Sequence, residues 1–342
     1  MNALSNLVEA VVERPETEGR TLARLAMKDG ATEIEWYGLS PTTFFGGGER
    51  VTETTTLISW SMAKSITHAL LGIAMVDGLL DVNDPAPFAE LQVEGQPPIR
   101  WIDLLEMRSG LTFVEDYEDV SASHCLEMLF SGEEHRGVAD MGLYAASLGR
   151  EFQPGEHWSY ASGTTNILCR MLGDILAGGD VASVGAEKRK NAIEQFAKER
   201  LFGPIGASSP IMKFDATGTF VGSSFVYATA RDFAAFGELY RRGGALDNGT
   251  QILPSGWHDH ARHWVAHDPE GPGPHGFDYG RHWWLWPDFE GSLVAQGFQG
   301  QYIFVLPEAG ITMVHLGITD TDVAVLLVEG LSEIVRELRS LA

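Results

Sequence analysis

The chain contains only two cysteines among its 342 residues, and basic residues are scarce as well. Cys125 and Cys169 lie far apart and form no CxxC pair, so the sequence has no disulfide framework and fits a reducing compartment. Lysine and arginine total 24 against 47 aspartates and glutamates, which gives a formal net charge of −23. Such an acidic surface repels phosphate backbones and anionic lipids, so we expect neither nucleic acid nor a membrane as a partner.

Long apolar runs are missing too. No apolar stretch approaches the roughly 20 residues that a membrane-spanning helix needs. Glu9, Glu13 and Glu16 lie where a secretory signal would need an uninterrupted apolar segment. We therefore expect a cytoplasmic protein.

Several enzyme motifs are absent. No serine stands in G-x-S-x-G, no H-E-x-x-H occurs, and Gly46–Gly48 lack the Gly-Lys-Ser/Thr ending of a P-loop. His258 and His260 are spaced like a chelating pair, but they lack further ligands and the residues after them have the composition of a solvent-facing loop. We therefore expect neither a metal nor another cofactor.

Strand-like alternation occurs near the two ends of the chain. The dipeptide Asp29-Gly30 joins the runs Thr21–Lys28 and Thr32–Tyr37, and it is typical of a hairpin turn. Two further β-like runs, Gln301–Leu306 and Ile311–Leu316, flank a second turn. Helical spacing of apolar residues predicts one helix between residues 4 and 12 and another after residue 323.

The middle of the chain has a different pattern. From residue 81 to about 209 it is helical and rich in loops, with a polar loop expected over 178–191 and a helix over 192–201. An α+β fold follows, in which helices flank an antiparallel sheet and a second subdomain is helical. Residues 1–80 and 210–342 would form the α/β subdomain, residues 81–209 the mainly helical one, and the active site would lie in the cleft between them.

Ser61 begins an S-x-x-K tetrapeptide that ends at Lys64, at the start of a helical apolar pattern. Residues i and i+3 share one face of a helix, so the Lys64 amine can approach the Ser61 hydroxyl, and free amides at the helix start can stabilise an oxyanion. A base that works near pH 7 requires the pKa of Lys64 to fall by about three units, which burial beside Trp60 can supply. The motif alone is weak, because chance supplies it about once in such a chain and a capping serine with an exposed lysine has the same letters.

Longer segments resemble the β-lactamase-like serine hydrolase superfamily, which has the class C β-lactamase and penicillin-binding-protein fold. These segments are Trp60–Ser65 (WSMAKS), Asp103–Leu111 (DLLEMRSGL), Pro154–Ser162 (PGEHWSYAS) and Ala228–Phe233 (ATARDF), and they follow the order of the family. The likeness covers nearly the whole chain from about Thr21. It implies a β-lactamase/transpeptidase-like fold.

The resemblance also implies roles for three side chains. Ser61 would be the nucleophile, Lys64 its activating partner, and Tyr160 the proton relay between the serine and the leaving group. A buried aromatic side chain with a satisfied hydroxyl is the alternative explanation for Tyr160.

The third motif of the family is where this sequence departs. If Gly297 matches the motif glycine, Ala295 occupies the place of the lysine that helps to hold a substrate carboxylate. Ser162 replaces the asparagine of the second motif in the same way. The resemblance implies that the backbone N–H of Phe298 joins that of Ser61 in an oxyanion hole, whereas the lost lysine weakens the case for β-lactam recognition.

The strand around Gly297 is followed by YIFVLPE and most resembles the esterase and 6-aminohexanoate-dimer hydrolase branch. That resemblance implies esters or small linear amides as substrates, with Tyr117 closing on the substrate. The loop around Asp116 is acidic and can receive an ammonium group, although a solvated run of charges is an equal explanation. The expected substrate-binding residues are Asp116, Tyr117, Ser162, Gln296, Gly297 and Gln299.

Three functions stay open at this point. The first is a serine hydrolase that cleaves carboxylic esters or small linear amides through an acyl-enzyme on Ser61. The second is an amide hydrolase of the 6-aminohexanoate-oligomer type. The third is a β-lactam- or peptide-binding protein with little turnover. The expected partner is a small-molecule ester or amide, and the oligomeric state, including a homodimer, is not fixed by the sequence.

Overall fold

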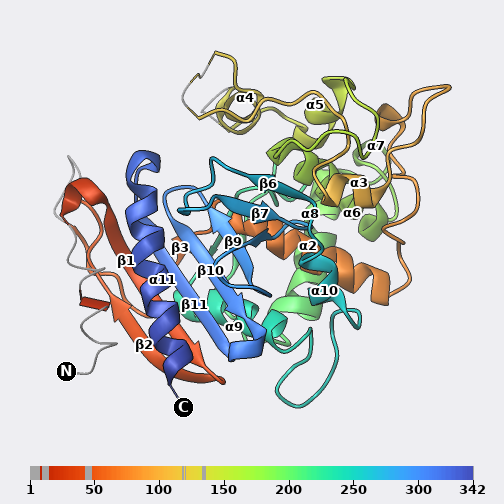
Figure 1. Ribbon diagram of the computed structural model, residues 1–342. Helices are drawn as coiled ribbons and strands as arrows, with labels where there is room; N and C mark the ends of the chain where they lie inside the picture. Colours follow the sequence, from red (N-terminus) through yellow and green to blue (C-terminus); the bar gives the residue numbers. More distant parts are fainter. Residues whose placement is uncertain are drawn as a thin grey trace.

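The structure is a computed structural model that describes residues 8–9, 15–42, 48–117, 119, 121–132 and 136–341. Most of the helix expected between residues 4 and 12 lies outside these residues, as do Gly46 and Gly47. The described chain is organised around an antiparallel sheet of eight strands in the order β2-β1-β11-β10-β9-β8-β7-β6 (Figure 1).

The strands of this sheet come from both ends of the chain. Their bounds are β1 (Arg20–Lys28), β2 (Ala31–Tyr37), β6 (Ala266–Asp268), β7 (Phe277–Tyr279), β8 (Trp284–Leu285), β9 (Leu293–Gly297), β10 (Gln301–Leu306) and β11 (Ile311–Ile318). The ends meet where β1 pairs with β11, with Arg24 opposite His315 and Lys28 opposite Ile311. The predicted antiparallel sheet is therefore confirmed.

The first hairpin has the turn that its sequence predicts. Asp29 has φ of 50° and Gly30 has φ of 84°, so both central residues are left-handed, as a two-residue hairpin turn with the right twist requires. Gly310, with φ of 66°, closes the turn between β10 and β11 in the same region of backbone conformation.

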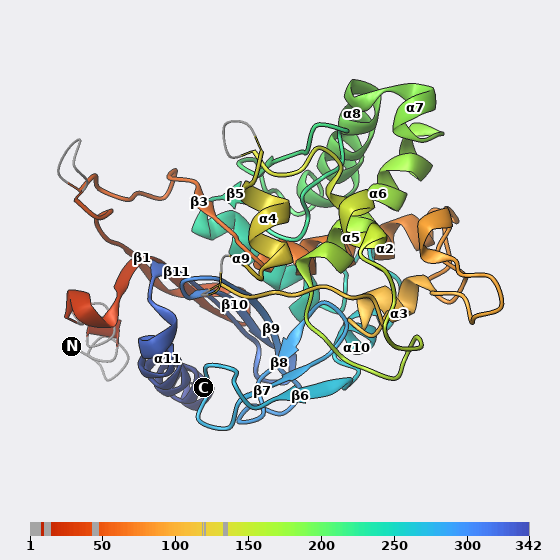
Figure 2. The same ribbon diagram turned by 90° about the horizontal axis from the view of Figure 1, so that it is seen from above.

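Helices cover both faces of the sheet. α11 packs on one face and α9 on the other, with α2 beside β9 and β10 on the α9 side (Figure 2). The described helices are α2 (Met62–Val76), α3 (Trp101–Leu105), α4 (His124–Phe130), α5 (Met141–Ser147), α6 (Ser162–Ala177), α7 (Val181–Val184), α8 (Ala186–Ala197), α9 (Ala230–Arg241), α10 (Trp257–Ala261) and α11 (Ala324–Ser340). None of them combines the length and apolarity that crossing a membrane requires.

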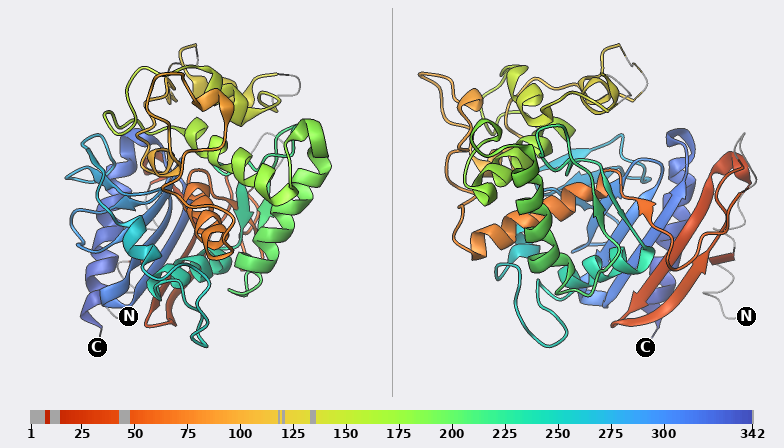
Figure 3. Two further views of the ribbon diagram at one scale, coloured as in Figure 1. Left: turned by 90° about the vertical axis from the view of Figure 1, so that its right-hand side faces the viewer. Right: turned by 180° about the vertical axis from the view of Figure 1, so that it is seen from behind.

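The helices of residues 81–209 gather at the end of the molecule away from β1 and β2 (Figure 3). The described residues of this segment contain no strand. The α+β fold class is thus confirmed, while the division into subdomains at residues 80/81 and 209/210 stays a proposal.

One element of this region was predicted wrongly. The polar stretch 178–191, expected as a loop, contains α7 and the first half of α8. One of its polar residues makes a tertiary contact that the sequence does not reveal: the fully buried Arg189 donates to Asp174 of α6 at 2.9 Å and to Thr219 at 3.0 Å. Gly185, with φ of 80°, provides the break between the two helices.

A second, smaller sheet leads directly to the start of α2. It consists of β3 (Leu57–Ile58), β5 (Val226–Ala228) and β4 (Ile211–Met212), in that order. Ser59 extends the pairing, since its backbone N–H donates to Val226 at 2.8 Å and its hydroxyl accepts from the Val226 N–H at 3.1 Å. This anchor fixes the residues immediately before α2.

A glycine in α9 tests how tightly the helix packs on the sheet. A Cβ on Gly237 would lie 2.7 Å from Thr312 Cγ2 and 2.9 Å from Ile303 Cγ2. Gly237→Ala should therefore lower the free energy of unfolding by about 1–3 kcal/mol, measured by urea denaturation. Gly173→Ala is the matched control in α6, where the nearest atom lies 3.4 Å away, and it should be neutral or slightly stabilising. Equal effects of the two substitutions would contradict the close packing of α9.

Candidate active site

Ser61 and Lys64 meet at the start of α2. The Lys64 Nζ donates to the Ser61 Oγ at 2.9 Å, which is the contact that the i, i+3 spacing predicts. Trp60, just before the serine, has φ of 44°, a strained value for a residue with a large side chain. The bend at Trp60 turns the chain from the small sheet into α2 and presents Ser61 at the helix N-terminus.

Lys64 is almost completely buried, with 2% of its surface exposed. Besides Ser61, its Nζ donates to Ser162 Oγ at 2.9 Å and to the backbone carbonyl of Ser223 at 3.1 Å. A lysine ammonium has three N–H donors, so each one has an acceptor here. The Nζ also lies 4.7 Å from the centre of the Tyr160 ring.

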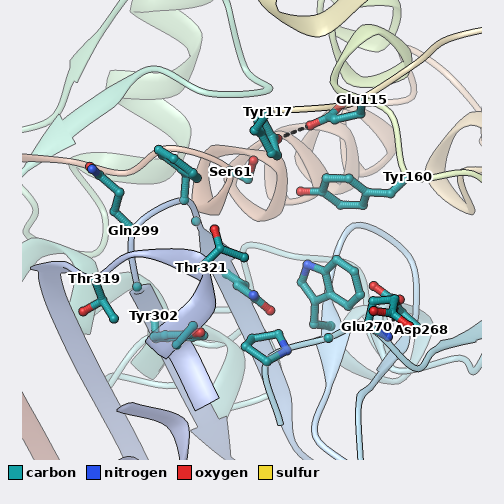
Figure 4. Close-up of a pocket in the computed structure, with 18 residues that line it drawn as sticks. Ser61, Glu115, Tyr117, Tyr160, Asp268, Glu270, Gln299, Tyr302, Thr319 and Thr321 are labelled. Atoms are coloured by element: carbon teal, nitrogen blue, oxygen red, sulfur yellow. Dashed lines mark hydrogen bonds between the residues drawn. The ribbon is translucent and has the colours of Figure 1, made fainter. Parts of the chain in front are cut away.

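Glu115 extends this network beyond Lys64. Ser162 Oγ donates to Glu115 Oε1 at 2.8 Å, and the backbone N–H of Ser162 donates to Glu115 Oε2. The hydroxyl of Tyr117 donates to the same carboxylate (Figure 4). A chain of hydrogen bonds therefore runs from Ser61 through Lys64 and Ser162 to Glu115.

The charges in this network contradict the expectation that the pKa of Lys64 is lowered. Burial alone would lower the pKa of Lys64, but Tyr160 in its ionised form and the Glu115 carboxylate more than offset it, and the pKa lies above its ordinary value. Burial raises the pKa of Tyr160, Glu115 raises it further, and the contacts with Lys64 and Ser61 only partly counter this. The resting site therefore holds an ammonium and a phenol at neutral pH.

Tyr160 faces Ser61 from the other side of the cavity. Its hydroxyl end points toward Ser61 in Figure 4. Its ring is held by Trp284, with ring centres 5.2 Å apart, and by Tyr279 at 5.8 Å. The three predicted catalytic side chains are thus brought together, and their catalytic roles stay predictions.

The two predicted oxyanion donors line the same cavity. Within the described residues, neither the backbone N–H of Ser61 nor that of Phe298 makes a hydrogen bond. A Cβ at Gly297 would lie 2.3 Å from the Ser59 carbonyl oxygen, so only glycine lets the end of β9 come this close to the start of α2. Both amides remain available to an oxygen in the cavity.

The cavity has a volume of about 350 Å³ and is lined by seven of the residues predicted for the site. Lys64 and Ser162 lie directly behind it, and Asp116 does not line it. Asp116 instead accepts a hydrogen bond from the Asp119 N–H at 3.0 Å within its own loop. The predicted residues in the lining are Ser61, Tyr117, Tyr160, Gln296, Gly297, Phe298 and Gln299.

Other lining residues were not predicted as site residues. Glu115 belongs to the acidic loop around Asp116, and nothing in its spacing from Ser61 or Tyr160 points to a hydrogen bond with Ser162. Asp268 and Glu270 come from the connection between β6 and β7, far from every motif. Tyr302 and Thr319 lie on or next to strands whose register only the folded sheet reveals. The acidity of the whole chain hinted at the carboxylates among these residues, but not at Tyr302 or Thr319.

His260, one of the two histidines considered for metal binding, packs in the core. His260 Nδ1 lies 3.1 Å from His68 Nε2 in the core behind α2, and Trp257 stacks on both rings. In the part of the chain that the structure describes, no group of three or more histidines, cysteines or carboxylates could hold a metal ion.

Comparison with known proteins agrees with the fold and the motifs. Residues 4–317 match the Beta-lactamase family, and the chain belongs to that family, whose fold is typically that of a hydrolase. No curated protein matches the sequence.

Solved structures resemble the chain over nearly its whole length at low sequence identity. A Bacillus anthracis protein assigned as a 6-aminohexanoate-dimer hydrolase shares 18% identity, with a TM-score of 0.71 over 99% of this chain and 81% of that one. EstCE1, described as a hydrolase with promiscuous acyltransferase activity, shares 15% identity, with a TM-score of 0.69 over 97% and 98%. A penicillin-binding protein homologue from Caulobacter crescentus shares 14%, with a TM-score of 0.67 over 97% and 98%. At these identities the likeness establishes the fold alone.

The charge of Glu115 can be tested without any substrate. Glu115→Gln keeps a hydrogen-bond acceptor but removes the negative charge that raises the pKa of Lys64. The Lys64 side chain should therefore titrate at a lower pH than in the wild type, as followed by NMR of ¹³Cε-labelled lysine. Glu156→Gln, at an exposed position, is the control and should leave that titration in place. An unchanged or higher midpoint in Glu115→Gln would mean that the carboxylate does not hold the proton on Lys64.

Proposed function

We propose that the protein is a serine hydrolase that cleaves carboxylic esters or small linear amides through an acyl-enzyme on Ser61. The observation that carries this proposal is the 2.9 Å contact between the Lys64 amine and the Ser61 hydroxyl, next to the Tyr160 phenol and open to a cavity. Nucleophile, proton carrier and relay are within reach of one another, as acyl transfer requires.

The first half of the reaction begins with the removal of a proton from Ser61. Because Lys64 starts as an ammonium, it must first release a proton, and the hydrogen-bonded path through Ser162 to Glu115 offers an acceptor. The free amine then takes the Ser61 proton as the serine oxygen attacks the substrate carbonyl carbon. The resulting oxyanion accepts hydrogen bonds from the backbone amides of Ser61 and Phe298.

The second half releases the products. The tetrahedral intermediate collapses when the bond to the leaving group breaks, and the leaving oxygen or nitrogen takes a proton from Tyr160, which Lys64 replaces. A water molecule then attacks the acyl-enzyme by the reverse sequence of proton transfers, which frees the acid and restores Ser61.

The charge of the cavity argues against β-lactam recognition. Among its described lining residues there is no lysine or arginine, and Ala295 stands where the family places a lysine. A substrate carboxylate would meet Glu115 and Asp268 with no cation on the wall to hold it. A binding protein for β-lactams is therefore poorly supported.

A second candidate, an amide hydrolase of the 6-aminohexanoate-oligomer type, is favoured by the position of Tyr117. Its hydroxyl donates to Glu115, its ring lies 5.3 Å from that of Phe298, and both rings line the cavity. If it exchanges its hydrogen bond to Glu115 for one to the substrate, this phenol can donate to the nitrogen of a scissile amide, which is a poorer leaving group than an ester oxygen.

Removal of the nucleophile tests the main proposal. Wild-type protein should be labelled by a fluorophosphonate probe and should hydrolyse short p-nitrophenyl esters, whereas Ser61→Ala should lose both properties. The loss of turnover should be at least about 10³-fold, as expected when a nucleophile is deleted. Ser131→Ala, which removes a serine outside the cavity, is the control. Folded wild-type protein that neither reacts with the probe nor hydrolyses any ester would refute the proposal.

The role of Tyr117 can be separated from that of Ser61. Tyr117→Phe should lower kcat/KM for 6-aminohexanoate dimer by about 10²-fold or more, the usual contribution of a proton donor, while ester hydrolysis changes little. The measurement is the ratio of the two kcat/KM values in wild type and variant. An equal effect on amide and ester would remove the special role of Tyr117 in amide cleavage.

A further inference from the structure

The turn between β9 and β10, which carries the Phe298 backbone N–H, is held by one buried side chain. That side chain is Gln301, which is 2% exposed. Its Nε2 donates to the carbonyls of Phe298 at 3.0 Å, Gln299 at 3.2 Å and Gly317 at 2.7 Å. Its Oε1 accepts from the Gly317 N–H at 3.0 Å. A single amide therefore ties two consecutive turn residues to β11.

The turn needs this hold because its backbone conformation is unfavourable. Gln299 has φ of 62°, and Gly300 has φ of 81°. A residue with a side chain rarely adopts the left-handed region, and it persists there only where its surroundings fix it. The Thr319 N–H donates to the Gln299 carbonyl at 3.1 Å and adds a restraint, on the same side of the cavity as Gln299 (Figure 4).

Gln301 also restrains the peptide unit that carries the Phe298 N–H. Before this unit, Gly297 pairs with the backbone of Gln301 across β9 and β10. A Cβ at Gly297 would lie 3.1 Å from the Gln301 Cβ, so the two residues are in close contact. After this unit, the Phe298 carbonyl accepts from the Gln301 side chain. The backbone and the side chain of Gln301 thus fix the Phe298 N–H from both directions along the chain.

We infer that Gln301 is a positioning residue of the oxyanion hole, which holds the Phe298 N–H where the oxyanion of the substrate forms. The inference rests on the proposed function, because it requires acyl transfer at Ser61. Gln301 lies behind the cavity and is not one of its described lining residues, so it acts through Phe298. Oxyanion donors work because they are aimed in advance, and a displacement of about 1 Å can cost about 10²-fold in rate.

The test compares p-nitrophenyl acetate with O-(p-nitrophenyl) thionoacetate, in which sulfur replaces the carbonyl oxygen. Sulfur is larger than oxygen and a weaker hydrogen-bond acceptor, so a well-aimed oxyanion hole favours the oxygen ester. The ratio of the two kcat/KM values therefore reports on the aim of the donors. A general loss of stability or of folded protein affects both esters and leaves the ratio in place.

Gln301→Met is the main variant, because it keeps the length of the side chain and removes all of its hydrogen bonds. It should lower kcat/KM for the oxygen ester by about 10-fold to 10²-fold and that for the thiono ester much less. The Lys64 titration should stay as in the wild type, because the charges of Glu115 and Tyr160 are retained. That result would show that the proton-transfer groups are undisturbed.

Gln251→Met is the matched control. The Nε2 of Gln251 also bridges two backbone carbonyls, those of Gly243 at 2.8 Å and Leu253 at 3.0 Å, but in a loop that does not line the cavity. This variant should keep the wild-type ratio. Gln301→Asn is a milder second variant, because it keeps the amide but is too short to bond the turn and Gly317 together. Its ratio should fall in the same direction by about threefold or more.

The outcomes separate this inference from the proposed function. A ratio that is unchanged in both Gln301 variants, whether or not their activity falls, would overturn the positioning role and leave the serine hydrolase intact. Failure of both variants to fold would overturn it as well, because the amide would then serve the sheet as a whole. Failure of folded wild type to hydrolyse p-nitrophenyl acetate or any other ester would instead refute the proposed function.

Discussion

The buried ammonium of Lys64 is the constraint on which the rest of the site depends. A charge with 2% exposure is tolerable only if each of its N–H groups is bound and an opposite charge is near. The structure meets this demand from three separate segments: the start of α2, the start of α6 and the turn that contains Ser223. Because these segments must converge on one nitrogen, the position of Ser61 is fixed by electrostatics as well as by packing.

Glu115 affects the protonation and the charge of the site as much as Lys64 does. With a carboxylate two hydrogen bonds away, the ammonium and the phenol of Tyr160 both keep their protons at rest. A carboxylate there also discourages anions from entering the cavity. The absence of a lysine at Ala295 and the presence of Glu115 are therefore two aspects of one charge arrangement, in which Lys64 is the cation that lies next to Ser61 among the described residues.

Local sequence patterns predicted the features that depend only on residues close together in the chain. The Asp29-Gly30 hairpin and the Ser61–Lys64 contact follow from turn chemistry and helical spacing, and resemblance added Tyr160. The direction of the Lys64 pKa shift was wrong because it depends on Glu115, which only the folded loop brings to Ser162. Tyr302 and Thr319 could not be predicted as lining residues, because strand register places them in the cavity. The helix over 186–191 could not be predicted either, because a buried arginine such as Arg189 cannot be told from a surface arginine in the sequence.

The pairing of β1 with β11 has a consequence for how the chain acquires its fold. Arg24 and His315 are neighbours in the sheet although almost the entire chain separates them. The β1–β2 hairpin can form early, but it stays an open edge until the last strand arrives. Contacts of such high sequence separation carry a large loop-closure cost, so folding is expected to be slow and to finish only after synthesis of the C-terminal strand. Until then, the apolar face of the hairpin depends on being shielded from other chains.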